Sequence, residues 1–484
     1  MRKVLVTGAS GYVGGRLVGS LLNSGFEVRV LVRNASKISG YPWVNHVEII
    51  EGDAFSFDDL KRALSDVHTA FYLLHSINAS VDFDKAEERM ARTFVEVARQ
   101  QNVQQIVYLG GIQNDVRTSR HLSSRARTGE ILASTEVPVL EIRAGIIIGS
   151  GSASFEMLRH LTHRLPLMTT PKWVSNKTHP IAIRDVLWYL DRAAKLETPV
   201  NGIYDVGGPD ILSYAEMMQI FAKVAGLRKR VIIQVPLLTP RLSSLWIGLV
   251  TPVPTSLAKP LVESLISETV ADEKKALKHL LGSPEEGLIS VEHAIELALT
   301  NTSQNAVATR WSDASLVSTP WQVTQSDPEW AGETEYHDER IQNSLLSSEV
   351  VWSNIEGIGG TRGWYGADIL WWARGLLDRL GGGVGLRRGR RDQNRLRVGD
   401  SLDFWRVEDI QSGKYLRLRA EMKLPGKAWL EFYLEDSGNK LQVRQKATFQ
   451  PHGLGGHMYW FLVLPFHIFV FPTMLRNITT KSYQ

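Results

Sequence analysis

Three glycines near the start of the chain, Gly8, Gly11 and Gly14, have the spacing of a phosphate-binding turn. They follow the short apolar run Lys3–Thr7, which predicts a strand, and overlap Tyr12–Ser24, whose apolar residues recur on one helical face. Glycines between a strand and a helix permit a tight turn, let a ligand approach the backbone and present the helix N–H groups to an anion. We expect this turn to bind the diphosphate of a dinucleotide; the alternative is a purely structural glycine turn.

The residue after the second predicted strand, Phe26–Val32, bears on which dinucleotide is preferred. Arg33 stands there, 19 positions after Gly14, and no Asp or Glu occupies the strand end. An acidic side chain at this place would bind the ribose 2′-hydroxyl of NAD, whereas an Arg accommodates the 2′-phosphate of NADP. With Lys37 as a second cation, the sequence favours NADP(H), and NAD(H) remains the alternative.

Asp53 and Ala54 follow the third predicted strand, Val47–Ile50. The Asp53 carboxylate is placed to accept a hydrogen bond from the adenine amino group, with Ala54 beside it. The alternative role for Asp53 is to cap the helix that follows. The two roles are compatible.

Strand and helix patterns alternate through the first part of the chain. Such alternation implies right-handed crossovers and a parallel sheet covered on both faces, which is a doubly wound α/β fold. Besides those named above, the predicted strands are Ala70–Leu74, Ile106–Leu109 and Val139–Arg143, and the predicted helices are Ser56–Ser65, Phe83–Gln101 and Ser123–Ser134.

After Gly145 the pattern becomes mixed, with helices expected around Tyr214–Ala225 and Val262–Leu281. We therefore predict a dinucleotide-binding domain over residues 1–300, of which about 146–300 form a small substrate subdomain. The polar residues 301–334 have the composition of a linker. A C-terminal α+β domain, residues 335–484, then carries short helices, four alternating strand-like runs and a long apolar helix, which suggests an antiparallel sheet around that helix with a cavity between them.

Composition excludes several classes of function. The net charge of +4 is small for 484 residues, so no global charge argues for binding nucleic acid. The absence of cysteine excludes disulfides, thiolate metal sites and a cysteine nucleophile. His160 and His163 lack a third ligand, so no metal site is expected. Glycines follow Val6 too early for a signal peptide, and we expect a cytoplasmic protein.

The C-terminal run Met458–Leu475 is almost long enough to span a bilayer, but it contains Pro465, His467 and Pro472. A buried or amphipathic terminal helix is the favoured interpretation. Peripheral contact with the inner face of a membrane is the alternative, because Gly385–Arg397 carries six arginines that could meet anionic headgroups.

The motifs TGASGYVG, Gly52-Asp53 after the third strand, and GIYDVGGPD at 202–210 resemble those of the short-chain dehydrogenase/reductase superfamily. The likeness is to its extended or atypical branch, the NmrA-like proteins and the nucleotide-binding accessory subunit of complex I, and it covers about Met1–Leu299. The resemblance implies a nicotinamide dinucleotide held by Thr7, Gly8, Ser10, Gly11, Tyr12, Val13, Gly14, Arg33, Asp53, Ala54 and Leu74. The strand end Leu73–Ser76 would pass near the cofactor riboses.

The catalytic Tyr-x-x-x-Lys pair of that superfamily is missing from all 484 residues. In the matching helix, Leu122 takes the tyrosine position and Ala126 the lysine position. Proton donors could instead come from the neighbouring side chains His121, Ser123, Arg125 and Arg127, although residues of these kinds more often lie at a helix surface or cap. The catalytic residues are therefore unknown from the sequence.

Two functions stay open. The first is an NADP(H)-binding oxidoreductase acting on a hydrophobic small molecule that resembles a quinone, an isoprenoid or a polyketide. The second is a non-catalytic redox sensor or scaffold. The C-terminal region resembles an uncharacterised domain fused to bacterial dehydrogenase-like proteins, and its strand pattern is similar to helix-grip folds, which implies a bound lipid or partner. The sequence does not determine the oligomeric state.

Overall fold

The computed structural model describes residues 2–75, 83–113, 119–234, 255–300, 332, 334–359, 362–366, 395–436 and 441–482. The chain forms two compact units, Met1–Gly332 and Glu333–Gln484. Most of the arginine-rich stretch and most of the 301–334 segment lie outside the described residues.

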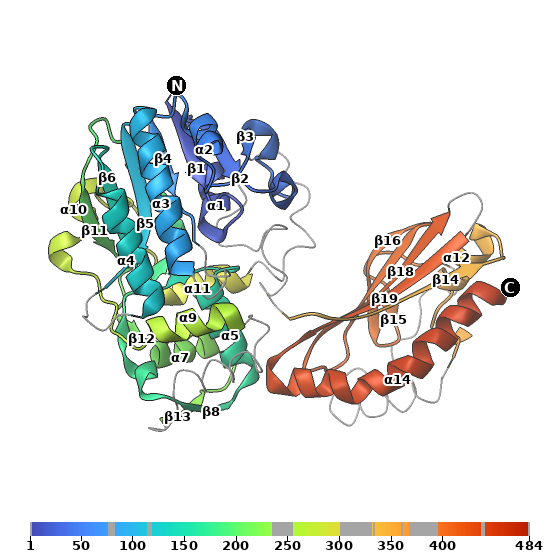
Figure 1. Ribbon diagram of the computed structural model, residues 1–484. Helices are drawn as coiled ribbons and strands as arrows, with labels where there is room; N and C mark the ends of the chain where they lie inside the picture. Colours follow the sequence, from blue (N-terminus) through green and yellow to red (C-terminus); the bar gives the residue numbers. More distant parts are fainter. Residues whose placement is uncertain are drawn as a thin grey trace. The chain divides into compact units, whose positions relative to one another are not determined.

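The first unit is built on a seven-stranded parallel sheet (Figure 1). The strand order is β11-β6-β5-β4-β1-β2-β3, so the chain reverses direction across the sheet between β1 and β4. This confirms the doubly wound α/β prediction. The strands are β1 Lys3–Thr7, β2 Glu27–Val32, β3 Glu48–Glu51, β4 Thr69–Tyr72, β5 Gln105–Gly111, β6 Val139–Ala144 and β11 Gly202–Val206; the helices that cover them are α1 Tyr12–Asn23, α2 Phe57–Leu64, α3 Phe83–Gln100, α4 Arg120–Leu132 and α6 Ile183–Ala194.

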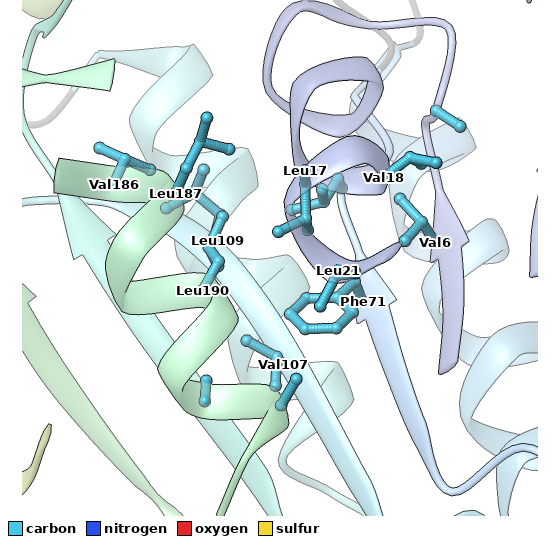
Figure 2. Close-up of a cluster of buried hydrophobic side chains, with 14 of the residues drawn as sticks. Val6, Leu17, Val18, Leu21, Phe71, Val107, Leu109, Val186, Leu187 and Leu190 are labelled. Carbon is cyan, nitrogen blue, oxygen red and sulfur yellow. The ribbon is translucent and has the colours of Figure 1, made fainter. Parts of the chain in front are cut away.

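Alternate residues of each strand pack on opposite faces of this sheet. Val4 and Val6 of β1 join the core beneath α1 and α6, while Leu5 joins the core beneath α2, α3 and α4. Figure 2 shows the first of these cores, where Leu17 and Leu21 of α1 and Leu190 of α6 lie near Phe71 and Val107 of the strands. The two cores fix the carboxyl ends of the strands at one edge.

Residues 146–300 add short paired strands and a helical layer with a core of its own. The prediction of one helix over Val262–Leu281 is wrong, since a helix ends at Ser264 and another begins only at Lys278. The elements are β7 Ile147–Ile148, α5 Ala153–Arg164, β8 Leu167–Thr170, β9 Lys177–Thr178, β10 Ile181–Ala182, β12 Leu212–Ser213, α7 Tyr214–Val224, β13 Val231–Gln234, α9 Thr255–Ser264, α10 Lys278–Leu281 and α11 Val291–Thr300.

The second unit is a six-stranded antiparallel sheet with a long helix, as predicted. Its order is β14-β19-β18-β17-β16-β15, and the edge strand β14 was not predicted. Ser347 caps the short helix α12 by accepting from the Val350 N–H. The elements are β14 Tyr336–Ser344, α12 Ser348–Glu356, β15 Ser401–Leu402, β16 Trp405–Gln411, β17 Tyr415–Ala420, β18 Gly426–Asp436, β19 Leu441–Pro451 and α14 Gly453–Thr480.

Helix α14 is apolar on two sides. One side packs in the core of the second unit through residues such as Met474 and Ile478. The other side exposes a stripe of large apolar residues, with Leu462 67% and Phe469 70% exposed. By length and composition α14 could cross a membrane, a test that the core helix of a soluble protein also passes. The exposed stripe consists of Leu454, Met458, Phe461, Leu462, Phe466, Ile468 and Phe469.

Candidate functional site

The turn after β1 is fixed by Gly8, which adopts the left-handed conformation with φ of +72°. The Gly11 N–H donates to the Gly8 carbonyl at 2.9 Å and closes the turn. A β-carbon at Gly8 would lie 2.5 Å from the Leu73 carbonyl oxygen, so only glycine fits against the end of β4. The turn therefore lies between β1 and β4, where the strand order reverses and doubly wound sheets bind their ligands.

Helix α1 begins directly behind this turn without a side-chain cap, because the capping residue is Gly11. Ser10 and Gly11 are exposed, and Val13 is half-buried against the core. A β-carbon at Gly14 would overlap the Gly8 carbonyl, so this third glycine lets the helix approach the turn closely. The uncovered, positive end of α1 is suited to an anion such as a diphosphate.

Thr7 is a fully buried residue whose hydroxyl donates to the Phe71 carbonyl at 2.9 Å and accepts from the Leu73 N–H at 3.2 Å. Its side chain therefore joins β1 to β4 directly below the glycine turn. Leu74 is half-buried at the same edge, just after β4. Thr7 thus holds the two strand ends in register, and Leu74 stands beside the turn.

Tyr12 lies at the start of α1 under the guanidinium of Arg16, which is 4.1 Å from the ring centroid. Arg16 also donates to the Tyr12 carbonyl at 3.1 Å and to the Ser150 carbonyl at 3.2 Å. The helix that carries the glycine turn is thereby linked to the beginning of the region after the sheet. Tyr12 contributes to this junction as well as to the predicted cofactor site.

Arg33 follows β2 directly and is exposed. Within the described part of the chain, it has no ion pair with an acidic side chain. Lys37 is exposed in the short 3-10 helix Ala35–Ile38. Both cations are therefore accessible to a phosphate at the carboxyl end of β2.

Asp53 lies after β3, where its carboxylate accepts from the Phe55 N–H at 3.0 Å. The suggestion that Asp53 caps the next helix is wrong, because Ser56 is the cap of α2 and accepts from the Asp59 N–H. Asp59 instead holds the Asp53 backbone N–H at 3.0 Å. Ala54 is buried in the core. The second carboxylate oxygen of Asp53 remains available for a ligand.

A cluster of His75, His121 and Arg125 forms beside this edge, and the importance of His75 was missed in the sequence. His75 follows β4, while His121 and Arg125 are one turn apart on α4. Burial, helped by the Arg125 and His121 charges, lowers the pKa of His75 well below its usual value. Burial, with Arg125 as the second cause, lowers the pKa of His121 to about 3. Both imidazoles are neutral at physiological pH, and within the described part of the chain the buried His121 Nδ1 atom has no hydrogen-bond partner.

The other donors considered on α4 lie elsewhere. Arg127 donates to Glu130 at 2.9 Å on the solvent side, and Ser123 is exposed. Leu122, in the tyrosine position, is buried in apolar surroundings. His160, the residue weighed as a metal ligand, lies 3.8 Å from Glu156, and no cluster of three metal-ligating side chains occurs among the described residues.

A family model described as NAD(P)H-binding matches residues 8–136, the segment that contains the glycine turn, Arg33 and Asp53. The first unit contains an NAD(P)H-binding domain. The match agrees with the nicotinamide dinucleotide-binding domain that the motifs led us to expect in this segment. A second model, described as a protein of unknown function (DUF2867), matches residues 330–474 and marks a separate C-terminal domain.

Two curated relatives are similar to part of this chain. Ceramide reductase of Caulobacter vibrioides is 26% identical over 237 residues, which are 47% of this chain and 72% of that protein. A 3-beta-hydroxysteroid dehydrogenase of Mycolicibacterium neoaurum is 30% identical over 152 residues, which are 28% of this chain and 40% of that protein. The match thus spans less than half of the second relative.

Among solved structures, a nucleoside-diphosphate-sugar epimerase from Staphylococcus aureus is similar in fold to part of this chain. Its TM-score is 0.50 at 15% sequence identity, covering 61% of this chain and 100% of that chain. At this identity the likeness concerns the fold alone.

Proposed function

We propose that this chain is an NADP(H)-dependent reductase of an apolar small molecule, of quinone-, isoprenoid- or polyketide-like character. The observation that carries the proposal is the pair of neutral imidazoles, His75 and His121, at the sheet edge that also holds the glycine turn. A protein that uses its dinucleotide only as a structural group has no need of a buried polar side chain such as His121 there, since an unpaired buried group costs about 1–3 kcal/mol.

The chain's own residues supply most parts of such a reaction. The glycine turn and the amino end of α1 hold the diphosphate, and Arg33 with Lys37 holds the 2′-phosphate of NADP(H). The bound cofactor supplies a hydride. His121 can donate a hydrogen bond from a ring N–H to the carbonyl oxygen that gains negative charge, and the Arg125 guanidinium one turn away stabilises that charge, while water supplies the proton that completes the alcohol. These two side chains replace the stabilisation of negative charge that the missing tyrosine and lysine would provide.

The names of the two relatives agree with an apolar substrate, because ceramide and 3-beta-hydroxysteroids are both largely apolar molecules. The size and shape of the substrate would be set by the region after the sheet, which Arg16 links to the glycine turn.

The test is the oxidation of NADPH, followed by its absorbance, with a panel of quinones and enones. We expect turnover with at least one of them, and a fall of about 10²-fold or more in kcat for His121→Leu. Arg127→Leu, on the solvent side of the same helix, should leave the rate unchanged. Equal rates for the two variants would remove His121 from the mechanism.

A second function, that of a nicotinamide-dependent sensor or scaffold, is favoured by the exposed stripe of α14. Seven large apolar side chains face solvent on a helix that contains no Asp or Glu. A contiguous exposed patch of this kind marks a contact surface, and the arginines of 387–397 would complement an anionic lipid surface. Tight nucleotide binding with no turnover across the panel would support this function over the first.

A further inference from the structure

In the second unit, the inner face of the sheet turns polar where β14 meets β19. Gln445 of β19 stands between Val443 and Ala447 on the face that forms the apolar core, and it is 1% exposed. Its neighbours across the sheet are Arg340 of β14 and Phe432 of β18. A polar amide thus occupies a position at which the alternation of the strand predicts an apolar residue.

Neither polar atom of this amide is satisfied. Both Nε2 and Oε1 of Gln445 are buried and have no hydrogen-bond partner among the residues that the structure describes. Buried polar groups are nearly always paired, and a side chain that leaves both a donor and an acceptor unpaired is unfavourable unless something else binds it. Gln445 therefore points to a ligand.

The charged neighbours of Gln445 are occupied with one another. The Arg340 guanidinium lies 2.9 Å and 3.0 Å from the two oxygens of Asp338, and His467 of α14 lies 3.5 Å from the same carboxylate. Burial alone would raise the pKa of Asp338, but the nearby His467 imidazole and the Arg340 guanidinium, which donates to this carboxylate, outweigh burial and lower that pKa. Asp338 and Arg340 thus form an ion pair whose charges neutralise each other. The Gln445 amide remains able to form hydrogen bonds with a ligand.

Helix α14 covers this polar cluster with aromatic rings. Trp460 of α14 stacks on Tyr336 with 5.3 Å between the ring centroids. Further along the same helix, Phe471 is buried in the core. Between these two anchors, His467 lies 5.1 Å from Trp460 and 4.5 Å from Phe471, measured between ring centroids. The surroundings of the amide are therefore apolar and aromatic, apart from the paired charges.

We propose that Gln445 binds the head group of an uncharged amphiphile, held between α14 and strands β14 and β19. A hydroxyl or carboxamide head both donates and accepts, and so satisfies Oε1 and Nε2 together. An ionised carboxylate has no proton for Oε1 and is repelled by Asp338. The apolar body of the ligand would lie against rings such as Phe432 and Trp460. This inference is independent of the proposed function of the first unit.

The experiment is calorimetric titration of the full-length chain with dodecanol, dodecanamide and dodecanoate below their aggregation concentrations. The expected result is binding of the alcohol or the amide in preference to the carboxylate. Gln445→Leu, which keeps the volume and removes the amide, should weaken this binding by about tenfold or more. The same variant should not lower Tm, because it removes an unsatisfied buried group.

Gln442→Leu is the matched control, since Gln442 lies on the outer face of the same strand, where it donates to Asn343 at 3.3 Å. It should bind the probes as the wild type does, which separates the site from adsorption on the exposed stripe of α14. Absence of binding by the wild type, or equal affinities in the Gln445 and Gln442 variants, would overturn the proposal. A marked fall in Tm for Gln445→Leu would also overturn it, because the amide would then serve the fold.

Discussion

The α-carbon of Gly8 lies against the backbone of Leu73, so closely that a β-carbon there would be 2.5 Å from the Leu73 carbonyl oxygen. This contact joins the turn after β1 to the end of β4. It places the glycine turn next to the strand end from which His75 follows. The cofactor site and the histidine cluster are thus positioned by one backbone contact.

Gly8→Ala should therefore destabilise the first unit by about 1–3 kcal/mol, because the methyl group adds a steric overlap to the strain of a left-handed φ. Gly25→Ala is the control, since Gly25 also has a left-handed φ, +82°, but a methyl group there would meet nothing within 4 Å. Denaturant unfolding measures both. Equal losses of stability in the two variants would show that the close contact with Leu73 does not add to the destabilisation by Gly8→Ala.

Arg33→Asp should weaken NADPH binding far more than NADH binding, by about tenfold or more in the ratio of the two affinities, because it replaces a phosphate-binding cation with an anion. Arg99→Asp, at the exposed end of α3, serves as the control for the change in net charge and should affect neither cofactor. Parallel losses of NADPH and NADH affinity in Arg33→Asp would contradict the assignment of the 2′-phosphate.

His121 should make the stability of the first unit depend on pH. Its pKa is about 3 in the folded chain and 6.5 for an unperturbed histidine, so the unfolded state binds the extra proton between these values. Stability is then complete above pH 6.5 and falls on acidification by about 1.4 kcal/mol per pH unit. His75, whose pKa is also lowered, adds a dependence of the same sign. His121→Leu should therefore make the loss of stability from pH 7 to pH 5 smaller in denaturant unfolding, and an unchanged slope would contradict a buried, neutral His121.

Paired substitution of Phe466 and Phe469 by Glu should abolish flotation of the protein with anionic liposomes if the stripe of α14 contacts lipid. The two side chains are 53% and 70% exposed, so the fold should tolerate the change. Ile341→Glu is the control, because Ile341 is 55% exposed and lies on the outward face of β14, not in the stripe of α14. If the wild-type protein does not float with the liposomes, the proposed contact of α14 with lipid is wrong.

Much of the first unit could be predicted because its buried strands and amphipathic helices have distinct periods, and because Gly8, Gly11 and Gly14 report a backbone requirement directly. Strand β14 could not, since Asp338, Arg340 and Gln342 occupy its inward positions and leave no apolar alternation. The histidine cluster also could not be predicted from the sequence. His75 and His121 are far apart in the chain, and only the fold brings the end of β4 and the start of α4 near enough for His121 to affect the pKa of His75.

The central claim is that the amino end of α1 binds the diphosphate of a nicotinamide dinucleotide. Calorimetric titration with NADP⁺, NADPH, NAD⁺ and NADH tests it most directly, alongside Gly11→Glu, which would place a carboxylate at the uncapped helix end. We predict one site per chain that prefers the phosphorylated cofactors and is lost in the variant. No binding of any of the four dinucleotides by the folded wild-type protein would contradict the account.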